Sequence, residues 1–448
     1  MLRMRSKKGS LYKMKLYKMK LYKILLYIAL FSSANATEIY TVDDLILKAL
    51  ENSPDLKISK ANYKASTSRY KQATAAYLPK IDLHASVGKL GMSDIPTNPN
   101  KMLTDTLLLG KLSLRQIIYD FGKTSSNSDI LRYDSKSFSS EYKQKISDKK
   151  RDVKRAYYNV LKAIALINVN RENVKLNKIQ LRRSKKYFKA GIRTKIDLSD
   201  ASIELLKSKL DLKKSQYDLK LAYAELDKII GFGAIHNDYK VYSQKLHLAT
   251  LYKSLKPYKL SLKESIEFAY KNRDEIQKQI SQVKVAHAKS HLASSNYYPS
   301  IYLNADYTKQ NVDKRINSVA TDQWQASINL DWNIYQGGAN SAQVQEKKIQ
   351  TNVANSNLAY TKLFIKTKIT QTYINMQKTK SSLKLSQSIL QASSQKFEQS
   401  SARYRNGLSD FIELQQSRHG YVDAMTNLVI NYYNYYTALA LLENAIGI

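Results

Sequence analysis

Four stretches of the chain alternate apolar and polar residues with a period of two, which predicts strands that each have one apolar face. In residues 324–335 the apolar positions are Trp324, Ala326, Ile328, Leu330, Trp332 and Ile334. The other three stretches have their apolar positions at Ile81, Leu83, Ala85 and Val87, at Leu108, Leu112, Leu114 and Ile118, and at Ile301, Leu303, Ala305 and Tyr307. The pattern predicts strands of about ten to twelve residues, a length that crosses a bilayer at a tilt.

The two faces of the predicted strands suit two different surroundings. Trp324 and Trp332 lie near the ends of the apolar face, as aromatic residues do in membrane barrels, and Asp331 lies on the polar face. Lipid outside and water inside a barrel account for this division, and a soluble sandwich with one core face is the alternative. Four strands are too few to close a barrel, so a membrane barrel requires several chains.

Two long segments, residues 123–188 and 340–404, contain neither proline nor glycine and predict helices of exceptional length. At 1.5 Å per residue, about 65 residues span roughly 100 Å. A series of positions in the first helix recurs every three or four residues and reads Val153, Tyr157, Val160, Ile164, Ile167, Arg171, Val174, Lys178, Leu181, Lys185 and Phe188. This imperfect coiled-coil seam predicts that the helix packs against neighbouring helices.

Each long helical segment runs into a glycine, and a second helical pattern opens a few residues later. The glycines are Gly191 and Gly407, and the new patterns open with Asp197 and Glu413, each followed by leucine. Glycine suits a helix end that needs a left-handed residue, and an acidic residue suits the first turn of the next helix. We therefore expect two helical hairpins with Gly191 and Gly407 at their tips.

The two halves of the sequence align with each other. Residues 41–56 match residues 261–276 at an offset of 220, whereas Gly191 matches Gly407 at an offset of 216. The difference of four lies in residues 93–106, which we interpret as a loop that tolerates changes of length. We infer a duplication in which each half consists of a helix, two strands, a long helix, a glycine turn and a last helix.

The first 36 residues predict a secretory signal peptide. Nine Lys and Arg residues and no acidic residue precede an apolar run at 24–31, which is followed by the A-x-A sequence Ala34-Asn35-Ala36. A signal-anchor that stays attached is the alternative, which the short apolar run disfavours. The predicted domains are a signal peptide at 1–36, a first repeat at 37–231, a side (equatorial) segment at 232–260 and a second repeat at 261–448.

The chain carries a net charge of +36, and a strongly basic protein often binds nucleic acid or anionic surfaces. Here the lysines are scattered through helical patterns and the chain is predicted to be exported, so we expect no nucleic acid. We attribute the basic excess to AT-rich coding. The sequence contains no cysteine, which excludes both a disulfide framework and a lipidated cysteine after the leader.

No catalytic or metal-binding motif is complete. Gly122-Lys123-Thr124 follows a strand like the end of a phosphate loop, but Ile117 stands where the first glycine is required. His287 and His291 are spaced as ligands on one helix face, without an acidic third ligand nearby. Asp197 and Glu413 occupy equivalent positions of a duplicated turn, which favours a symmetric ring over an acid and base pair. We expect no enzyme activity, cofactor or metal.

The leader, the duplicated halves, the two amphipathic strands per half, the long helices and the glycine turns together resemble the TolC family of outer-membrane efflux proteins. The resemblance covers about residues 37–448 and implies a mainly α fold with a membrane β-barrel. In that family a homotrimer builds one 12-stranded barrel in the outer membrane of a Gram-negative bacterium, and its long coiled-coil hairpins form an α-helical tunnel across the periplasm. The implied partners are a periplasmic adaptor (membrane fusion) protein and an inner-membrane ABC or proton-driven transporter.

The resemblance also implies roles for residues at the hairpin tips, where the family closes its tunnel. The acidic ring position falls on Glu413, and the next ring position falls on Gln416 in place of an acid. The linking tyrosine falls on Tyr404 and its carboxylate partner on Asp197. A basic residue that usually joins this lock falls on Ser409, a second departure from the family pattern.

Two questions stay open at this point. An exported coiled-coil adhesin or structural stalk is the alternative to a channel, and it explains the helices but neither the alternating strands nor the duplication. Within the channel interpretation, type I protein secretion and small-molecule efflux use the same conduit. The absence of a lipidated cysteine leans slightly toward the branch that includes type I secretion.

Overall fold

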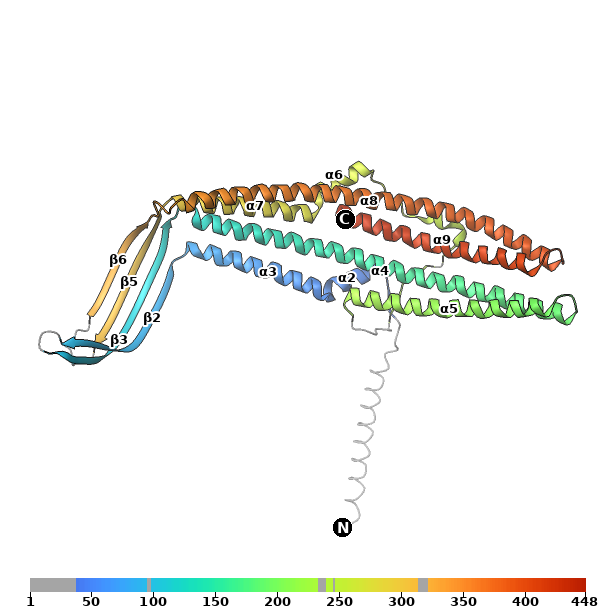
Figure 1. The fold of residues 1–448 in the computed structure, drawn as a ribbon, viewed down its shortest axis with the longest axis horizontal. Helices are drawn as coiled ribbons and strands as arrows, with labels where there is room; N and C mark the ends of the chain where they lie inside the picture. The colour runs from blue at the N-terminus through green and yellow to red at the C-terminus, as the bar shows by residue number, and fades with distance from the viewer. Residues whose placement is uncertain (1–37, 95–97, 233–238, 245, 313–320) are drawn as a thin grey trace, which may run out of the picture. The chain divides into compact units, whose positions relative to one another are not determined.

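The computed structural model describes residues 38–94, 98–232, 239–244, 246–312 and 321–448 (Figure 1). The predicted signal peptide and part of the predicted side segment lie outside these residues. The contacts within the chain define two compact units. Among the described residues, the first unit is formed by those within 38–49 and 156–247, and the second by those within 50–155 and 248–448.

The elements of the first half of the sequence recur in the second half. The first half contains α2 (Val42–Asn52), α3 (Pro54–Thr74), β2 (Lys80–Asp94), β3 (Asn98–Tyr119), α4 (Lys123–Lys189) and α5 (Lys195–Ile230). The second half contains α6 (Leu262–Asn272), α7 (Asp274–Ser294), β5 (Ser300–Val312), β6 (Thr321–Asp331), α8 (Ala339–Arg405) and α9 (Phe411–Ile446). Equivalent helices have equal lengths of 11, 21, 67 and 36 residues.

Two helices precede the strands in each half, where the pattern predicted one. α3 begins at Pro54, which fits the first helical position because its missing N–H has no partner there. The preceding helices start with the same reciprocal cap. The Thr41 hydroxyl accepts from the Asp44 amide at 3.3 Å, and the Ser261 hydroxyl accepts from the Glu264 amide at 3.3 Å. Each carboxylate accepts the cap residue's own N–H in return, at 2.9 and 2.7 Å.

The four long strands form one antiparallel sheet in the order β2-β3-β5-β6 (Figure 1). The register confirms the predicted faces, because Ile301 pairs with Leu330 and Tyr307 pairs with Trp324. The predicted lengths were wrong for the first hairpin, where β2 has 15 residues and β3 has 22. Prolines and asparagines made residues 93–106 look like a loop, but the ladder continues there, for example between Ser93 and Met102.

The apolar face of the sheet is exposed in the single chain. Trp324 is 78% exposed, and Leu83, Val87 and Ile328 are similarly open. On the polar face, Lys111 Nζ lies 3.2 Å from an Asp306 carboxylate oxygen. Apolar surface that faces water costs about 25 cal/mol of free energy per Å². We therefore expect this face of the sheet to be covered by an apolar environment outside the single chain.

In the second unit, α8 packs along α9 and α7 packs along α8 (Figure 1). Ile365 and Ile369 from α8 are fully buried against Leu442 and Ile446 from α9, in a cluster that also contains Ile276 of α7. Each such side chain contributes about 1.5–3 kcal/mol when it is buried. The ends of α4 and α8 lie within one residue of the predicted limits.

In the first unit, the C-terminal part of α4 runs beside α5, and Asn170 donates a hydrogen bond to Ser215 at 3.2 Å (Figure 1). The predicted seam is wrong at Arg171, Lys178 and Lys185, which are exposed, whereas its position at Val174 is buried as predicted. After Val174 the buried series continues instead through Asn177, Gln180 and Ser184. A straight helix drifts by about 20° per heptad from a strict seven-residue repeat, which amounts to about one position over five heptads.

Candidate functional site

The tip of the first hairpin is a glycine turn between α4 and α5. Gly191 has a φ of +68°, and the Ile192 amide donates to the Tyr187 carbonyl at 2.9 Å across the helix end. Thr194 then caps α5, because its hydroxyl accepts from the Asp197 amide at 3.3 Å. Asp197 lies in the first turn of α5 and is partly buried. These contacts satisfy backbone groups that helix ends otherwise leave unpaired.

The tip of the second hairpin has the same backbone chemistry. Gly407 has a φ of +77°, and the Leu408 amide donates to the Arg403 carbonyl at 2.9 Å. Asp410 caps α9, because its carboxylate accepts from the Glu413 amide at 2.8 Å. The expectation that Gly191 and Gly407 turn the chain between two helices is met at both positions.

The side chains of the second tip pack together. Tyr404 is only 1% exposed and Phe411 only 3%, and their rings meet edge to face with centroids 6.3 Å apart. Arg403 Nε lies 3.4 Å from a Glu413 carboxylate oxygen, and the Ser400 hydroxyl donates to the same oxygen at 3.4 Å. Glu413 therefore has a cation and a hydroxyl from its own hairpin beside it.

The residues predicted from the sequence fall into two groups. Tyr404, Ser409 and Glu413 come together at the second tip, with Ser409 partly buried in the turn and Gln416 exposed on α9. Asp197 belongs to the first tip, in the other unit. The sequence reasoning missed Arg403 and Phe411. When the two tips are aligned, Phe411 of the second tip corresponds to Lys195 of the first. This change from a charged to an aromatic residue was a signal in the sequence that could have identified Phe411.

The two predicted barrel tryptophans lie at the apolar edge of the sheet. Trp324 is in β6, whereas Trp332 lies just beyond the end of that strand at Asp331. The Trp332 ring N–H donates to the Tyr297 carbonyl at 3.0 Å, so the indole has a polar anchor and an apolar body. Tryptophans with this combination are typical of the border between hydrocarbon and water.

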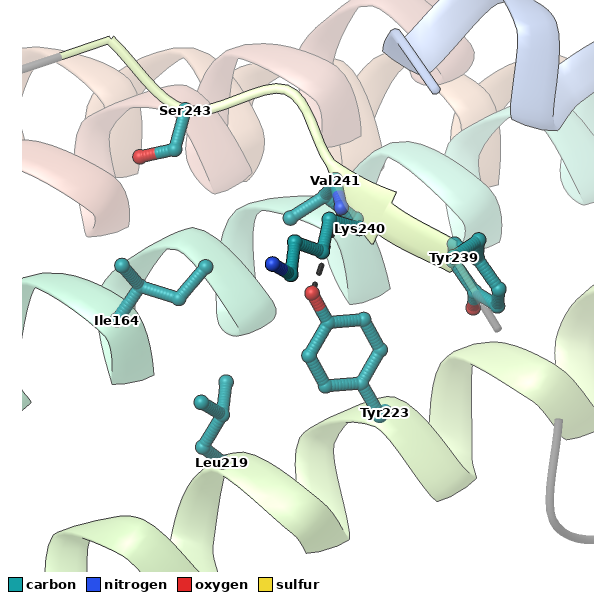
Figure 2. Close-up of a pocket in the computed structure, with 7 residues that line it drawn as sticks. All are labelled: Ile164, Leu219, Tyr223, Tyr239, Lys240, Val241 and Ser243. Atoms are coloured by element: carbon teal, nitrogen blue, oxygen red, sulfur yellow. Dashed lines mark hydrogen bonds between the residues drawn. The ribbon is translucent and has the colours of Figure 1, made fainter. Parts of the chain in front are cut away.

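A side element of the first unit lines part of a half-open pocket of about 460 Å³ (Figure 2). The side element consists of two short strands, β1 (Glu38–Tyr40) and β4 (Tyr239–Val241), which pair in parallel. The Tyr223 hydroxyl accepts from the Val241 amide at 3.3 Å, and the Tyr239 hydroxyl donates to Asp227 at 2.7 Å. Burial, together with that carboxylate, raises the pKa of Tyr239. The other side chains around the pocket are Ile164, Leu219, Lys240 and Ser243.

Within the residues that the structure describes, no group of three His, Cys, Asp or Glu side chains is placed to hold a metal ion. None of the helices described is both long and apolar enough to cross a membrane.

The model of the outer membrane efflux protein family matches residues 45–232 and 266–448. The chain belongs to this family. Family membership places the protein in the outer membrane and confirms the predicted fold class, in which long helical hairpins are combined with a small barrel sheet. Comparison with curated protein sequences gives no significant match.

Solved structures of outer-membrane channels share the fold of this chain at low sequence identity. CusC is 17% identical with a TM-score of 0.79, over 91% of this chain and 92% of its own. CmeC from Campylobacter jejuni is 18% identical with a TM-score of 0.77, over 91% and 85%. VceC from Vibrio cholerae is 16% identical with a TM-score of 0.76, over 91% and 96%. Each match extends over the helices and strands alike, which identifies the whole architecture.

Proposed function

We propose that three copies of this chain form the exit duct of an export assembly, a passive channel through the outer membrane. The two-faced sheet carries this proposal. One face of β2, β3, β5 and β6 presents large exposed apolar side chains and the other presents charged and polar ones. Four strands cannot close by themselves, whereas twelve strands from three chains form a barrel with lipid outside and water inside.

The assembly can be tested on protein extracted from outer membranes. We expect a trimer band that survives mild detergent and collapses to a monomer band on heating. Purified trimers should produce discrete conductance steps in planar bilayers. A monomer that forms no pores under these conditions would overturn the proposal.

The hairpin tips are the proposed gate of the channel. The family resemblance assigns Tyr404 and Asp197 to a hydrogen bond that holds neighbouring hairpins closed, and Glu413 to an acidic ring. The burial of Tyr404 within its own hairpin shows that this side chain is part of the packed tip that the proposed gate is built on. We expect Tyr404→Phe combined with Asp197→Ala to raise single-channel conductance. Tyr421→Phe, which alters a tyrosine stacked on Phe397 away from the tip, is the control and should leave conductance unchanged.

The proposed partners are a periplasmic adaptor and an inner-membrane transporter that delivers the substrate. The efflux description of the family favours small molecules over type I protein secretion as the first substrate class to test. Deletion of the gene should increase the accumulation of small efflux substrates such as dyes in intact cells. Unchanged accumulation together with loss of a secreted protein would instead assign the channel to type I secretion.

A further inference from the structure

In the part of the chain that the structure describes, the four-stranded sheet has two edge strands. β2 and β6 form its edges, whereas β3 and β5 lie inside it (Figure 1). Backbone N–H and C=O groups along an unpaired edge are unfavourable in a membrane, where water cannot reach them. In a barrel built from copies of this chain, an arrangement that rests on the proposed function, β6 of one copy therefore has to pair with β2 of the next.

The internal duplication reproduces the register of the hairpins in the structure. Subtracting 220 from a residue of β5 and 216 from its partner in β6 gives a pair of the β2–β3 ladder. Ser300 with Asp331 becomes Lys80 with Arg115, and all eleven pairs of the β5–β6 ladder coincide in this way. Both offsets come from sequence matches between helices and between hairpin tips, so the agreement of the strands is independent of them.

The same offsets relate the seam inside the chain to the seam between copies. Inside the chain, the first half meets the second where β3 pairs with β5. β3 corresponds to β6 and β5 corresponds to β2, so this pairing is a template for β6 against β2 of the next copy. Arg115 pairs with Asn304 in the template. The offsets then place Asp331 opposite His84 of the next copy.

The faces and charges of the strands agree with this register. The same mapping places Ile328 opposite Val87 of the next copy, which joins two exposed side chains of the apolar face. A shift by one residue would bring polar side chains onto the apolar face. A shift by two residues would place Asp331 opposite Asp82 of the next copy, where like charges repel, or opposite Ser86, which carries no charge.

Asp331 already takes part in a polar cluster inside one copy. The Arg115 guanidinium lies over the Tyr302 ring, 4.3 Å from its centroid, and the Tyr302 hydroxyl donates to Asp331. Within the described residues, no Lys or Arg of the same chain forms an ion pair with Asp331. His84 is exposed on the polar face of the other edge strand. An imidazole N–H can donate to a carboxylate in either protonation state of the ring.

We propose that His84 of one copy lies opposite Asp331 of the next on the water-facing wall of the barrel, and that it completes this polar cluster. Each seam between copies then carries the series Arg115, Tyr302, Asp331 and His84 of the next copy. An imidazole directly across from a carboxylate stabilises one register over its neighbours, which lack such a pair. Side chains therefore specify the seam in addition to the backbone ladder.

Cysteine cross-linking tests the register, since the chain has no cysteine of its own. We expect His84→Cys with Asp331→Cys to give a covalent trimer that survives heating without reductant. Asp82→Cys or Ser86→Cys, each with Asp331→Cys, should link at least about tenfold more slowly, because diagonal neighbours are about 7–8 Å apart and exceed the reach of a disulfide.

The matched control is the template pair inside the chain. Arg115→Cys with Asn304→Cys should form its disulfide within one copy and leave a monomer after heating. Faster linking of Asp331→Cys to either neighbour of position 84 would overturn the inference. Trimers and pores that show no link between copies, while the control forms its disulfide, would overturn it as well. The absence of both trimers and pores in the unmodified protein would refute the proposed channel itself.

A charge exchange tests the pair of side chains. His84→Asp places two carboxylates opposite each other and should lower the temperature at which trimers separate on heating. Adding Asp331→His restores an imidazole opposite a carboxylate and should recover most of that loss. Ser86→Asp, on the same strand and face, is the control and should change the temperature less. No recovery in the exchanged pair would show that the two side chains do not interact, even if the register is correct.

Discussion

The two hairpin tips have the same backbone and different side chains. Both turn at a glycine of positive φ, and both cap the next helix at the amide of an acidic residue. In the second tip Tyr404 is buried against Phe411, whereas the equivalent positions in the first tip hold Phe188, which is 40% exposed, and Lys195. The path of the chain therefore depends on glycine and caps alone. An aromatic pair adds stability to one tip only.

The largest effect is expected at the aromatic pair. Phe411→Ala should remove about 3 kcal/mol of local stability, because a buried ring is lost and a cavity remains beside Tyr404. Hydrogen exchange of residues 400–416 should then accelerate by roughly a hundredfold, since 1.4 kcal/mol is a factor of ten. Lys195→Ala in the first tip is the control, and exchange there should change little. Equal effects at the two tips would contradict the comparison.

The glycines should respond equally. Gly191→Ala and Gly407→Ala should each cost about 1 kcal/mol, because both residues are left-handed and neither would meet another atom with its new methyl group. Gly420→Ala within α9 is the matched control and should stabilise the helix slightly. Thermal unfolding of the detergent-solubilised protein measures all three. A larger loss at one of the two turns would show that its side chains, and not its backbone, set the cost.

The missing aromatic pair can be added to the first tip. Lys195→Phe places a ring opposite Phe188, as Phe411 lies opposite Tyr404 in the second tip. We expect a gain of about 0.5–1.5 kcal/mol in the local stability of residues 184–200, measured as slower hydrogen exchange there. Lys195→Leu is the control for hydrophobicity without a ring. No slowing in Lys195→Phe would mean that the two turns differ in more than their side chains.

The smallest effect concerns a feature that both halves share, the reciprocal caps. The Thr41 hydroxyl and N–H hold the pKa of Asp44 below 3.8, and the Ser261 N–H and hydroxyl hold that of Glu264 below 4.5. A lowered carboxyl pKa contributes stability above its unfolded value, and the contribution disappears as pH falls through the folded value. Unfolding temperatures of Glu264→Gln and the unmodified protein should therefore converge as the pH falls below about 4.5.

Long-range periodicity made the helices and strand faces predictable. The absence of proline and glycine fixed the limits of α4 and α8 to within a residue, and the alternation of Ile301, Leu303 and their neighbours gave the correct face of the sheet. The length of β3 was not predictable, since its ladder extends through residues that favour turns in isolation. The seam of α4 failed at Arg171, Lys178 and Lys185, because a small drift per turn accumulates along a long helix.

At the candidate site, the sequence predicted where residues lie along the hairpins better than which side chains they contact. The glycine turns, Asp197 and Glu413 lie at helix ends as the pattern required. The pairing of Arg403 with Glu413 was missed, since it depends on two side chains that meet across a turn. The family pattern placed the basic partner at Ser409, whereas this chain supplies a cation from the last turn of α8.

The parallel pairing of β1 with β4 imposes an order on folding. Glu38 lies beside Tyr239 in the register, 201 residues later in the sequence. A chain that is exported from its N-terminus delivers β4 only after more than half of its length has crossed the inner membrane. Until then β1 has no partner strand, and the cost of closing so long a loop slows their encounter. We therefore expect the first unit to be completed only after β4 has been exported, later than the helices that need no partner from that part of the chain.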